Sequence, residues 1–438
     1  MNTWIRNGHL LDPDTGRNGL FDILIADGKI KAVGSFSEEE TRGYQVIDAF
    51  GLHIMPGFID LHVHFREPGF EYKETIATGM KAAAKGGFTS VCPMPNTNPA
   101  IDTAEQIKRV LDIGKKEGNG VRLYPVGAVT KGQLGTILTD IKGMIKAGAK
   151  AISEDGKSVM DTGLYRKAMK IAAQERIPVF AHCEDKYIAG DGVIGEGEKA
   201  KELGLSGIPN TAEDVITARD IILAKETGVH LHLCHCSTKG SVEMVQRAKE
   251  DGISVTAEVC PHHFSLSQED IPADDADYKM NPPLRSVEDR KACTKGLSNG
   301  TMDVIATDHA PHSEEEKKLS FAEAPFGIVG LETAFALTVT NLVLTGWLTP
   351  MQMVERLSRN PARVIGMRGG SLREGMPADL VIADMNEEYR IDKGSFLSKG
   401  KNTPFHNRIV KGRIIKTLID GEEIYQYDGS ISGSDKKA

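Results

Sequence analysis

The sequence has no long apolar run and no excess of basic residues. Its start, MNTWIRNGHLLDP, holds no apolar stretch of signal-peptide length, and no later stretch approaches a membrane span. Lys and Arg number 53 against 61 Asp and Glu, a formal net charge of -8, which gives no basic footprint for nucleic acid. We therefore expect a cytoplasmic protein with neither a membrane nor a nucleic acid as partner.

Cysteine is scarce and shows no zinc-ribbon spacing. Most of the six cysteines lie in strand-like runs, where a reduced and buried thiol is usual. We therefore predict no disulfide among Cys92, Cys183, Cys234, Cys236, Cys260 and Cys293. No G-x-G-x-x-G turn directly joins a predicted strand to a helix, as it would in an open dinucleotide-binding sheet; the one match, residues 190–195, lies outside the predicted strands.

Short apolar or alternating runs recur along the middle of the 438 residues. There are eight, beginning at Gly57, Phe88, Val121, Ala149, Ile177, Val229, Ile253 and Met302. Helix-like segments lie between most of them, such as residues 103–118, 164–177 and 241–252. Strands that alternate with helices predict an α/β fold, and eight such units predict a (β/α)8 TIM barrel. An open doubly wound sheet is the alternative.

The two ends of the chain have a different pattern. ILIADGKIKAVG, residues 23–34, consists of two alternating runs about an Asp-Gly turn, a hairpin signal. Residues 378–384 and 408–426 repeat this style. Neither end is long enough for a β core alone, so we predict one small β-sandwich domain built from both termini. The predicted boundaries are 1–53 and 365–427 for this domain, 54–364 for the barrel and 428–438 for a disordered tail.

The stretch IDLHVHFREPG, residues 59–69, alternates polar and apolar side chains. Side chains two positions apart on a strand share a face, and here the polar ones are Asp60, His62, His64 and Arg66. Two histidines on one face can reach the same metal ion. A strand whose polar face meets water is the plainer interpretation, and this stretch alone leaves both open.

Polar residues also follow the other predicted strands, at the carboxyl ends where barrels form their active sites. In chain order they are His62, His64, Asn96, Asp155, His182, His235, Asp308 and His312. Each one alone could be a turn residue, a helix cap or a core histidine. Four histidines and two carboxylates that converge on one mouth, however, predict a binuclear metal site.

The sixth predicted strand offers three histidines. Alternation places His230 and His232 on the face opposite His235, and His235 is nearest the strand end, so we predict His235 as the ligand. We expect the adjacent His262 and His263 to be structural or to support the ligands by hydrogen bonds. Direct contact of one of them with the site is the alternative.

Seven motifs together resemble the bacterial dihydroorotases of the amidohydrolase superfamily. They are GFIDLHVHFREPG, AHCED, HLCHCSTKGS, EVCPHHF, NPPLR, IATDHAPH and APFGIVGLE, and the resemblance covers essentially the whole chain. It implies reversible hydrolysis of (S)-dihydroorotate to N-carbamoyl-L-aspartate, the third step of de novo pyrimidine biosynthesis. It also implies a homodimer, with aspartate transcarbamoylase as a possible further partner.

The resemblance implies a role for each site residue. His62, His64 and Asp308 would hold one Zn²⁺, His182 and His235 a second, and Asp155 would bridge both together with a hydroxide. Asp308 would also carry the proton from the hydroxide to the leaving nitrogen. The implied substrate contacts are Arg66, Asn96, Asn281, His312, Phe326 and Gly327, with the planar fork of Arg66 suited to a carboxylate. Residues 312–327 are the candidate lid.

One departure from many relatives concerns the metal bridge. Hydantoinases, allantoinases and some dihydroorotases use a carboxylated lysine on strand four, but here Lys150 is near the strand start and Lys157 lies beyond the turn. Asp155 therefore resembles the aspartate bridge of one dihydroorotase class.

Two alternative functions remain from the sequence. An allantoinase or hydantoinase-type cyclic amide hydrolase is the first, although its substrate would give Arg66 no carboxylate to bind. A non-catalytic scaffold homologue is the second, and it would be expected to lose metal ligands. This chain keeps all six.

Overall fold

One sheet of eight strands joins both ends of the chain. The structure is a computed structural model and describes residues 2–429, so most of the predicted tail lies outside the described residues. The hydrogen-bonded order is β19-β18-β17-β5-β1-β2-β3, with β4 beside β1. The bounds are β1 Thr3–Asp12, β2 Arg17–Ala26, β3 Lys29–Gly34, β4 Gln45–Asp48, β5 His53–Pro56, β17 Leu380–Arg390, β18 Ile409–Ile419 and β19 Glu422–Gln426. Strands from both ends of the chain therefore share one sheet, while the small β-sandwich domain built from both termini stays a prediction.

The predicted hairpin near the N-terminus is present. β2 and β3 pair antiparallel, with Ala26 opposite Lys29. Asp27 and Gly28 form the turn with φ of 50° and 73°, the left-handed conformation that a tight two-residue hairpin requires at both positions. The Asp-Gly pair thus fixes the register of the two strands.

Short parallel strands form the centre of the molecule. They pair in the orders β6-β7-β8 and β16-β15-β14-β11-β10-β9. Their bounds are β6 Phe58–Val63, β7 Phe88–Pro93, β8 Arg122–Leu123, β9 Val126–Ala128, β10 Ala151–Ser153, β11 Val179–Ala181, β14 Leu231–Leu233, β15 Val255–Val259 and β16 Val304–Ile305. All eight predicted strand regions are present, the third in two pieces. A parallel bridge between Val63 and His309 links the first region to the last.

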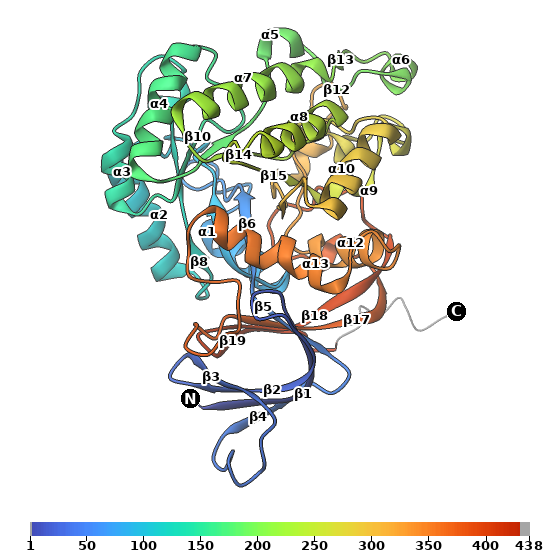
Figure 1. Ribbon diagram of the computed structural model, residues 1–438. Helices are drawn as coiled ribbons and strands as arrows, with labels where there is room; N and C mark the ends of the chain where they lie inside the picture. The colour runs from blue at the N-terminus through green and yellow to red at the C-terminus, as the bar shows by residue number, and fades with distance from the viewer. Residues whose placement is uncertain (1, 430–438) are drawn as a thin grey trace.

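Helices alternate with these strands along the chain (Figure 1). The α-helices are α1 Ile76–Lys85, α2 Ala104–Glu117, α3 Ile141–Ala147, α4 Thr162–Glu175, α5 Lys186–Ala189, α6 Glu198–Leu203, α7 Thr211–Thr227, α8 Lys239–Glu250, α9 Pro261–Ser265, α10 Val287–Asn299, α11 Glu314–Lys317, α12 Ala334–Thr338, α13 Pro350–Val354 and α14 Asn360–Val364. A two-stranded sheet, β12 Ile194–Gly195 with β13 Gly207–Ile208, lies in an insertion before α7. The three helix-like segments singled out in the sequence correspond to α2, α4 and α8.

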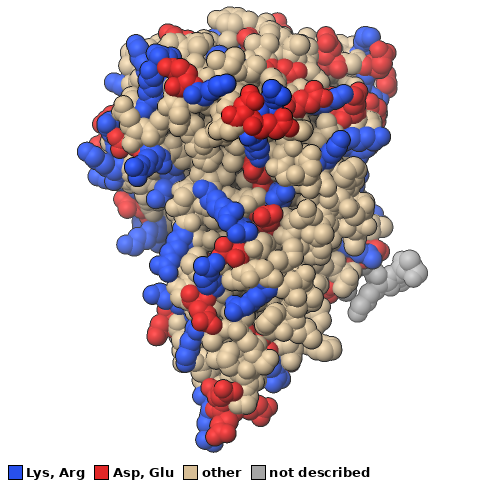
Figure 2. Space-filling model, viewed as in Figure 1, with Lys and Arg blue, Asp and Glu red and all other residues tan. Residues whose placement is uncertain are grey.

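The surface charges, the cysteines and the helices of the described residues match what the composition predicts. Basic and acidic side chains are interspersed over the face shown in Figure 2, without a continuous basic area. All six cysteines are buried free thiols, as predicted. Among the described residues, no helix combines the length and the apolar character needed to cross a membrane.

Candidate active site

A pocket opens where the central strands end. Its lining is His64, Arg66, Asn96, Asp155, Gly156, His182, His235, Asn281, Asp308, Ala310, Phe326 and Gly327. Nearly all of the residues predicted as ligands or substrate contacts are therefore brought together. The two exceptions are His62, which lies fully buried beside Asp155, and His312, which contacts Arg66 from outside the lining.

The first group of candidate metal ligands comes from the end of β6. His62 Nε2 lies 3.2 Å from Asp155 Oδ1 and 3.6 Å from Asp308 Oδ1. His64 Nε2 lies 3.0 Å from Asp308 Oδ1 and 3.5 Å from Asp155 Oδ2. Asp60, two residues before His62, lies outside the pocket lining and accepts a 3.1 Å hydrogen bond from the Thr307 backbone.

The second group follows β11 and β14. His182 Nδ1 lies 3.0 Å from His235 Nε2, and each of these atoms lies 3.7 Å from Asp155 Oδ1. The ligand atoms of each group lie within 4.8 Å of one another, and Asp155 belongs to both groups. Asp155 thus has the position of a carboxylate shared between two sites.

Hydrogen bonds fix which ring nitrogen of His62 and of His64 faces the centre. His62 Nδ1 lies 2.9 Å from Glu258 Oε1, and a carboxylate can only accept, so Nδ1 carries a proton. His64 Nδ1 lies 2.8 Å from Asn96 Oδ1, while the Asn96 amide nitrogen donates to Asp155 over 3.3 Å. In the neutral rings, both Nε2 atoms therefore present lone pairs toward carboxylates.

This arrangement fits a metal ion. His62 Nε2 and Asp155 Oδ1 are buried, and neither has a hydrogen-bond partner among the described residues. Burial disfavours a charged His62, yet Asp155 and Asp308 raise the pKa of its ring well above the usual value, so positive charge is stabilised here. Zinc bonds of 2.0–2.1 Å place tetrahedral ligand atoms about 3.3 Å apart, close to these distances. The site can therefore hold metal.

The side-chain directions on strand six differ from the prediction. β14 ends at Leu233, and His235 follows in a left-handed conformation with φ of 34°, so strand alternation does not extend to it. His232 also points to the interior, where its Nε2 lies 2.9 Å from Glu258 Oε2. The opposite-face argument was wrong because it continued the strand past its end, although His235 does lie at the site.

The His262 and His263 pair lies outside the pocket lining. His263 Nε2 lies 2.9 Å from the carbonyl oxygen of Pro282, which follows Asn281. Both histidines are buried in the short helix α9. His263 thus supports the loop that carries Asn281.

Glu258 on β15 contacts the candidate ligands His62 and His235 and was not predicted from the sequence. Its fully buried carboxylate contacts His62 Nδ1 and His232 Nε2 and accepts a 3.1 Å hydrogen bond from the His235 backbone. Burial alone would raise its pKa, but the bonds with His232 and His62 outweigh burial and lower the pKa to about 2. An acidic residue within the apolar run ISVTAEV was the available signal.

We expect Glu258→Gln to weaken metal binding without unfolding the protein. A glutamine can accept a hydrogen bond from one histidine but must donate with its other arm, so it cannot hold both rings. Loss of such an outer partner costs about 10- to 100-fold in metal affinity. Competition with a chelator measures this loss, with Glu213→Gln, a buried glutamate bonded to Ser237, as control. Equal metal affinities for Glu258→Gln and wild type would contradict the role.

The predicted substrate contacts other than His312 line the same pocket. Arg66 has φ of 60°; its Nε donates to the carbonyl oxygen of Pro311 over 3.2 Å, and its Nη2 lies 3.3 Å from His312 Nε2. Asn281 donates to Glu184 over 2.8 Å. A Cβ at Gly327 would lie 2.6 Å from the carbonyl oxygen of Ala310, so only glycine allows this close approach.

Asn402, from the connection between β17 and β18, was also missed. Its Oδ1 accepts from the His312 backbone over 3.0 Å, and its Nδ2 donates to the carbonyl oxygens of Ala310 and Gly327 over 3.1 and 3.0 Å. One buried amide therefore ties together two loops that form the pocket. It lies 90 residues from His312 in sequence, and no local pattern links the two.

Comparison with known proteins identifies the family. A family model described as Dihydro-orotase-like matches residues 51–241. The dihydroorotase of Pelotomaculum thermopropionicum is 48% identical over 97% of this chain and 99% of its own length. That of Bacillus licheniformis is 49% identical with the same coverage. The chain belongs to the dihydroorotase family.

Solved structures place the family in a wider group. The L-hydantoinase (dihydropyrimidinase) of Arthrobacter aurescens superposes with a TM-score of 0.86 at 26% identity, covering 97% of this chain and 96% of its own. The dihydropyrimidinase of Brevibacillus agri gives 0.85 at 24% identity, which shows the shared fold alone. Within this amidohydrolase fold, the relatives named dihydroorotase are much more similar in sequence.

Proposed function

We propose that the protein hydrolyses dihydroorotate to N-carbamoyl-L-aspartate and catalyses the reverse ring closure. The observation that carries this proposal is one pocket whose lining combines candidate metal ligands from two overlapping groups with the partly buried Arg66. The ligand groups suit activation of water, and Arg66 suits a carboxylate beside the scissile amide. Relatives named dihydroorotase over nearly the whole chain support the same reaction.

We assign two zinc ions to the centre. His62, His64 and Asp308 would hold one, His182 and His235 the other, and Asp155 would bridge them. The pair would supply a hydroxide nucleophile at neutral pH and polarise the scissile carbonyl. The lone pairs of His62 and His64 and the shared position of Asp155 support this assignment.

Asp308 is the proposed acid and base. Burial alone would raise its pKa, but His62 and His64 outweigh burial and hold the pKa well below its usual range. The carboxylate is therefore ionised and can take the proton of the attacking oxygen. It would then deliver that proton to the ring nitrogen as the C–N bond breaks. His64 Nε2 lies 3.0 Å from this carboxylate, a separation that suits two ligands of one metal ion.

Arg66, Asn96, Asn281 and His312 would orient the substrate, with the backbone at Phe326 and Gly327. The fork of Arg66 suits the carboxylate, and its partly buried position strengthens this pairing. Burial, followed by the charges of Arg66 and Lys73, lowers the pKa of His312 far below its usual value. A neutral His312 can lie beside Arg66 without repelling it. The 312–327 segment remains the candidate lid.

The architecture that we propose for this activity is a closed (β/α)8 barrel over residues 54–364 with a small β-sandwich from residues 1–53 and 365–427. Closure is supported by the bridge between Val63 and His309 and by the hydrogen bond from the His64 backbone to the His309 carbonyl, 2.8 Å. The single sheet shared by both termini supports the small domain. The homodimer, the association with aspartate transcarbamoylase and the cytoplasmic location stay predictions.

One assay tests the proposal against its nearest alternative. Purified protein loaded with zinc is offered dihydroorotate, allantoin and dihydrouracil under the same conditions. We expect turnover of dihydroorotate, the only one of the three with a carboxylate beside its ring. Preferential turnover of dihydrouracil or allantoin would favour the hydantoinase-type function, and no turnover of any would favour the scaffold.

Arg66→Ala should damage substrate use while leaving zinc in place, because Arg66 contacts no metal-facing atom. Unpairing a charge-assisted contact in a closed site costs about 2 to 4 kcal/mol, or roughly 30- to 1,000-fold in kcat/KM. Steady-state kinetics and metal analysis measure the two effects. Arg122→Ala, which breaks an ion pair with Asp379 away from the pocket, is the control. Loss of zinc from Arg66→Ala would overturn the assignment.

A further inference from the structure

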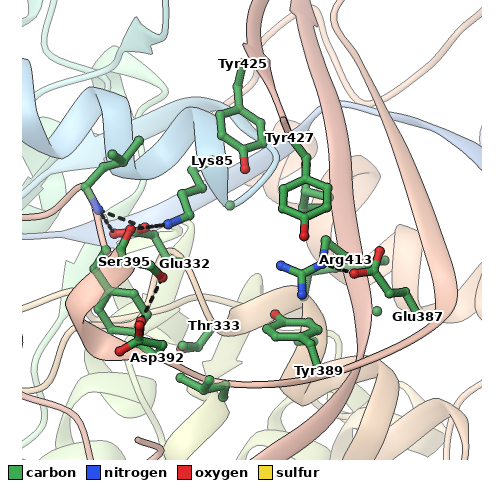
Figure 3. Close-up of a pocket in the computed structure, with 18 of the residues that line it drawn as sticks. Lys85, Glu332, Thr333, Glu387, Tyr389, Asp392, Ser395, Arg413, Tyr425 and Tyr427 are labelled. Carbon is green, nitrogen blue, oxygen red and sulfur yellow. Dashed lines mark hydrogen bonds and ion pairs between the residues drawn. The ribbon is translucent and has the colours of Figure 1, made fainter. Parts of the chain in front are cut away.

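A second pocket lies between the terminal sheet and the helices around the central strands. Residues at the end of α1 and in α12 line one side, and residues of β17, β18 and β19 line the other. It shares no lining residue with the candidate active site. Figure 3 shows part of the lining, with the labelled side chains Lys85, Glu332, Thr333, Glu387, Tyr389, Asp392, Ser395, Arg413, Tyr425 and Tyr427.

The central feature of this pocket is Arg413, which is held between two aromatic rings. Its guanidinium carbon lies 3.8 Å from the ring centroid of Tyr389 and 4.4 Å from that of Tyr427 (Figure 3). Its Nε donates to Glu387. Within residues 2–429, neither Nη atom has a hydrogen bond to a neighbour. Stacking and one ion pair thus fix a guanidinium whose terminal N–H groups are available to a planar acceptor.

Tyrosine hydroxyls add donors around Arg413. In the described part of the chain, the hydroxyls of Tyr389, Tyr425 and Tyr427 have no hydrogen-bond partner. Burial raises the pKa of Tyr389 and of Tyr425 to about 12, so both phenols stay protonated at neutral pH. Lys85 is already committed, because its amine lies 2.9 Å from Glu332 Oε2. Besides its carboxylates, of which Glu332 and Glu387 are paired with Lys85 and Arg413, the lining offers the Nη groups of Arg413 and the tyrosine hydroxyls as donors, which suit an acceptor on the ligand.

The remaining lining decides the kind of acceptor. Phe335, Ile391 and Ile414 give the cavity an apolar part that a polyphosphate would not use. Glu388, Asp392 and Asp428 also line it, and their charges disfavour a ligand with several negative charges. We propose that this pocket binds a small monocarboxylate with an apolar, preferably aromatic, body, whose carboxylate pairs with the Nη groups of Arg413.

The pocket also has a physical connection to the active site. Ser395 and Leu397 line it, and the Leu397 backbone donates to Glu332 over 2.8 Å. The same segment continues to Asn402, whose amide holds the His312 and Gly327 loops. A ligand in the pocket would contact one end of a segment whose other end positions the substrate loops, so binding is expected to change KM for dihydroorotate.

Benzoate is a suitable probe ligand for this pocket, and benzamide, which has the same ring but no charge, is the control ligand. Calorimetric titration up to about 10 mM covers the ~1 mM dissociation constant of a weak fragment. We expect wild type to bind benzoate more tightly than benzamide and Arg413→Gln to bind benzoate at least about tenfold more weakly. The control is Arg166→Gln, an exposed arginine paired with Glu226. Absence of benzoate binding in wild type, or equal binding by Arg413→Gln, would overturn the proposal.

Two further variants keep the test decisive. Tyr427→Phe preserves the ring that stacks on Arg413 but removes the hydroxyl, so it should fold and bind benzoate several-fold more weakly even if Arg413→Gln is unstable. Arg66→Ala removes the other carboxylate site and should still bind benzoate. Binding lost in Arg66→Ala but kept in Tyr427→Phe would place benzoate in the active site and overturn the proposal.

The kinetic arm rests on the proposed dihydroorotase activity, whereas the calorimetric arm does not. A change of KM by benzoate in wild type that disappears in Arg413→Gln supports the connection through Asn402. Calorimetric binding with unchanged kinetics would overturn that connection and leave the binding site standing.

Discussion

Asp308→Asn should abolish almost all turnover while leaving a folded protein with at least one bound zinc. Asparagine keeps the shape of the side chain and one coordinating oxygen, but it cannot accept the proton that the reaction releases. Loss of a general base costs about 10²- to 10⁴-fold in rate. The variant keeps its place beside His62 and His64, so structure and metal content should change little. Steady-state kinetics, metal analysis and circular dichroism measure the three expectations.

Asp303→Asn is the matched control for this experiment. Asp303 immediately precedes β16, whereas Asp308 follows it, and the Asp303 carboxylate pairs with Lys249 away from the pocket. Its replacement should leave turnover near the wild-type level. If Asp308→Asn retained a tenth or more of wild-type turnover, the proton would have to leave by another group.

The order of elements could be predicted from the sequence because its signals are local. The run at Gly57 and the helix-like segment 164–177 each carry their own periodicity, and both elements are present as β6 and α4. The points at which strands break or end could not be predicted from local periodicity. The third strand divides into β8 and β9, and the chain leaves strand geometry before His235, because neighbouring strands and not local propensity decide where pairing stops.

For the candidate site, too, residues with a local signal could be predicted from the sequence, and residues that act through distant contacts could not. Metal-ligand candidates such as His62 and Asp155 could be proposed from the sequence because barrels bring the carboxyl ends of their strands together. Glu258 and Asn402 were missed for a different reason. They act through hydrogen bonds to residues far away in sequence, 196 positions from Glu258 to His62 and 90 from Asn402 to His312. Only the folded chain reveals such partners.

Asp155→Ala should remove the second zinc before the first. Asp155 is shared by both ligand groups, and without it His182 and His235 provide only two protein ligands, too few for a stable zinc site. His62 and His64 would still have Asp308. Zinc content measured during stepwise dialysis against a chelator should therefore fall from two to one per chain, with activity lost at that step. Retention of two zinc ions would contradict the bridging role.

Glu154→Gln is the matched control, since Glu154 is the adjacent buried carboxylate but contacts Thr130 and lies outside the pocket lining. It should keep both zinc ions.

The aspartate bridge should also make reconstitution independent of bicarbonate. A carboxylated lysine forms from carbon dioxide, but Asp155 carries its carboxylate already. Burial alone would raise the pKa of Asp155, but His62 and His235 outweigh burial and lower it well below the usual value. Lys150 is exposed at the strand start, and the Lys157 amine donates to the carbonyl oxygen of Gln133 over 3.1 Å, so neither reaches the centre.

Metal-stripped protein should therefore regain full activity with zinc alone in bicarbonate-free buffer. A strict bicarbonate requirement, or crystallographic density for a carbamate on either lysine, would defeat the aspartate bridge and leave the proposed reaction standing.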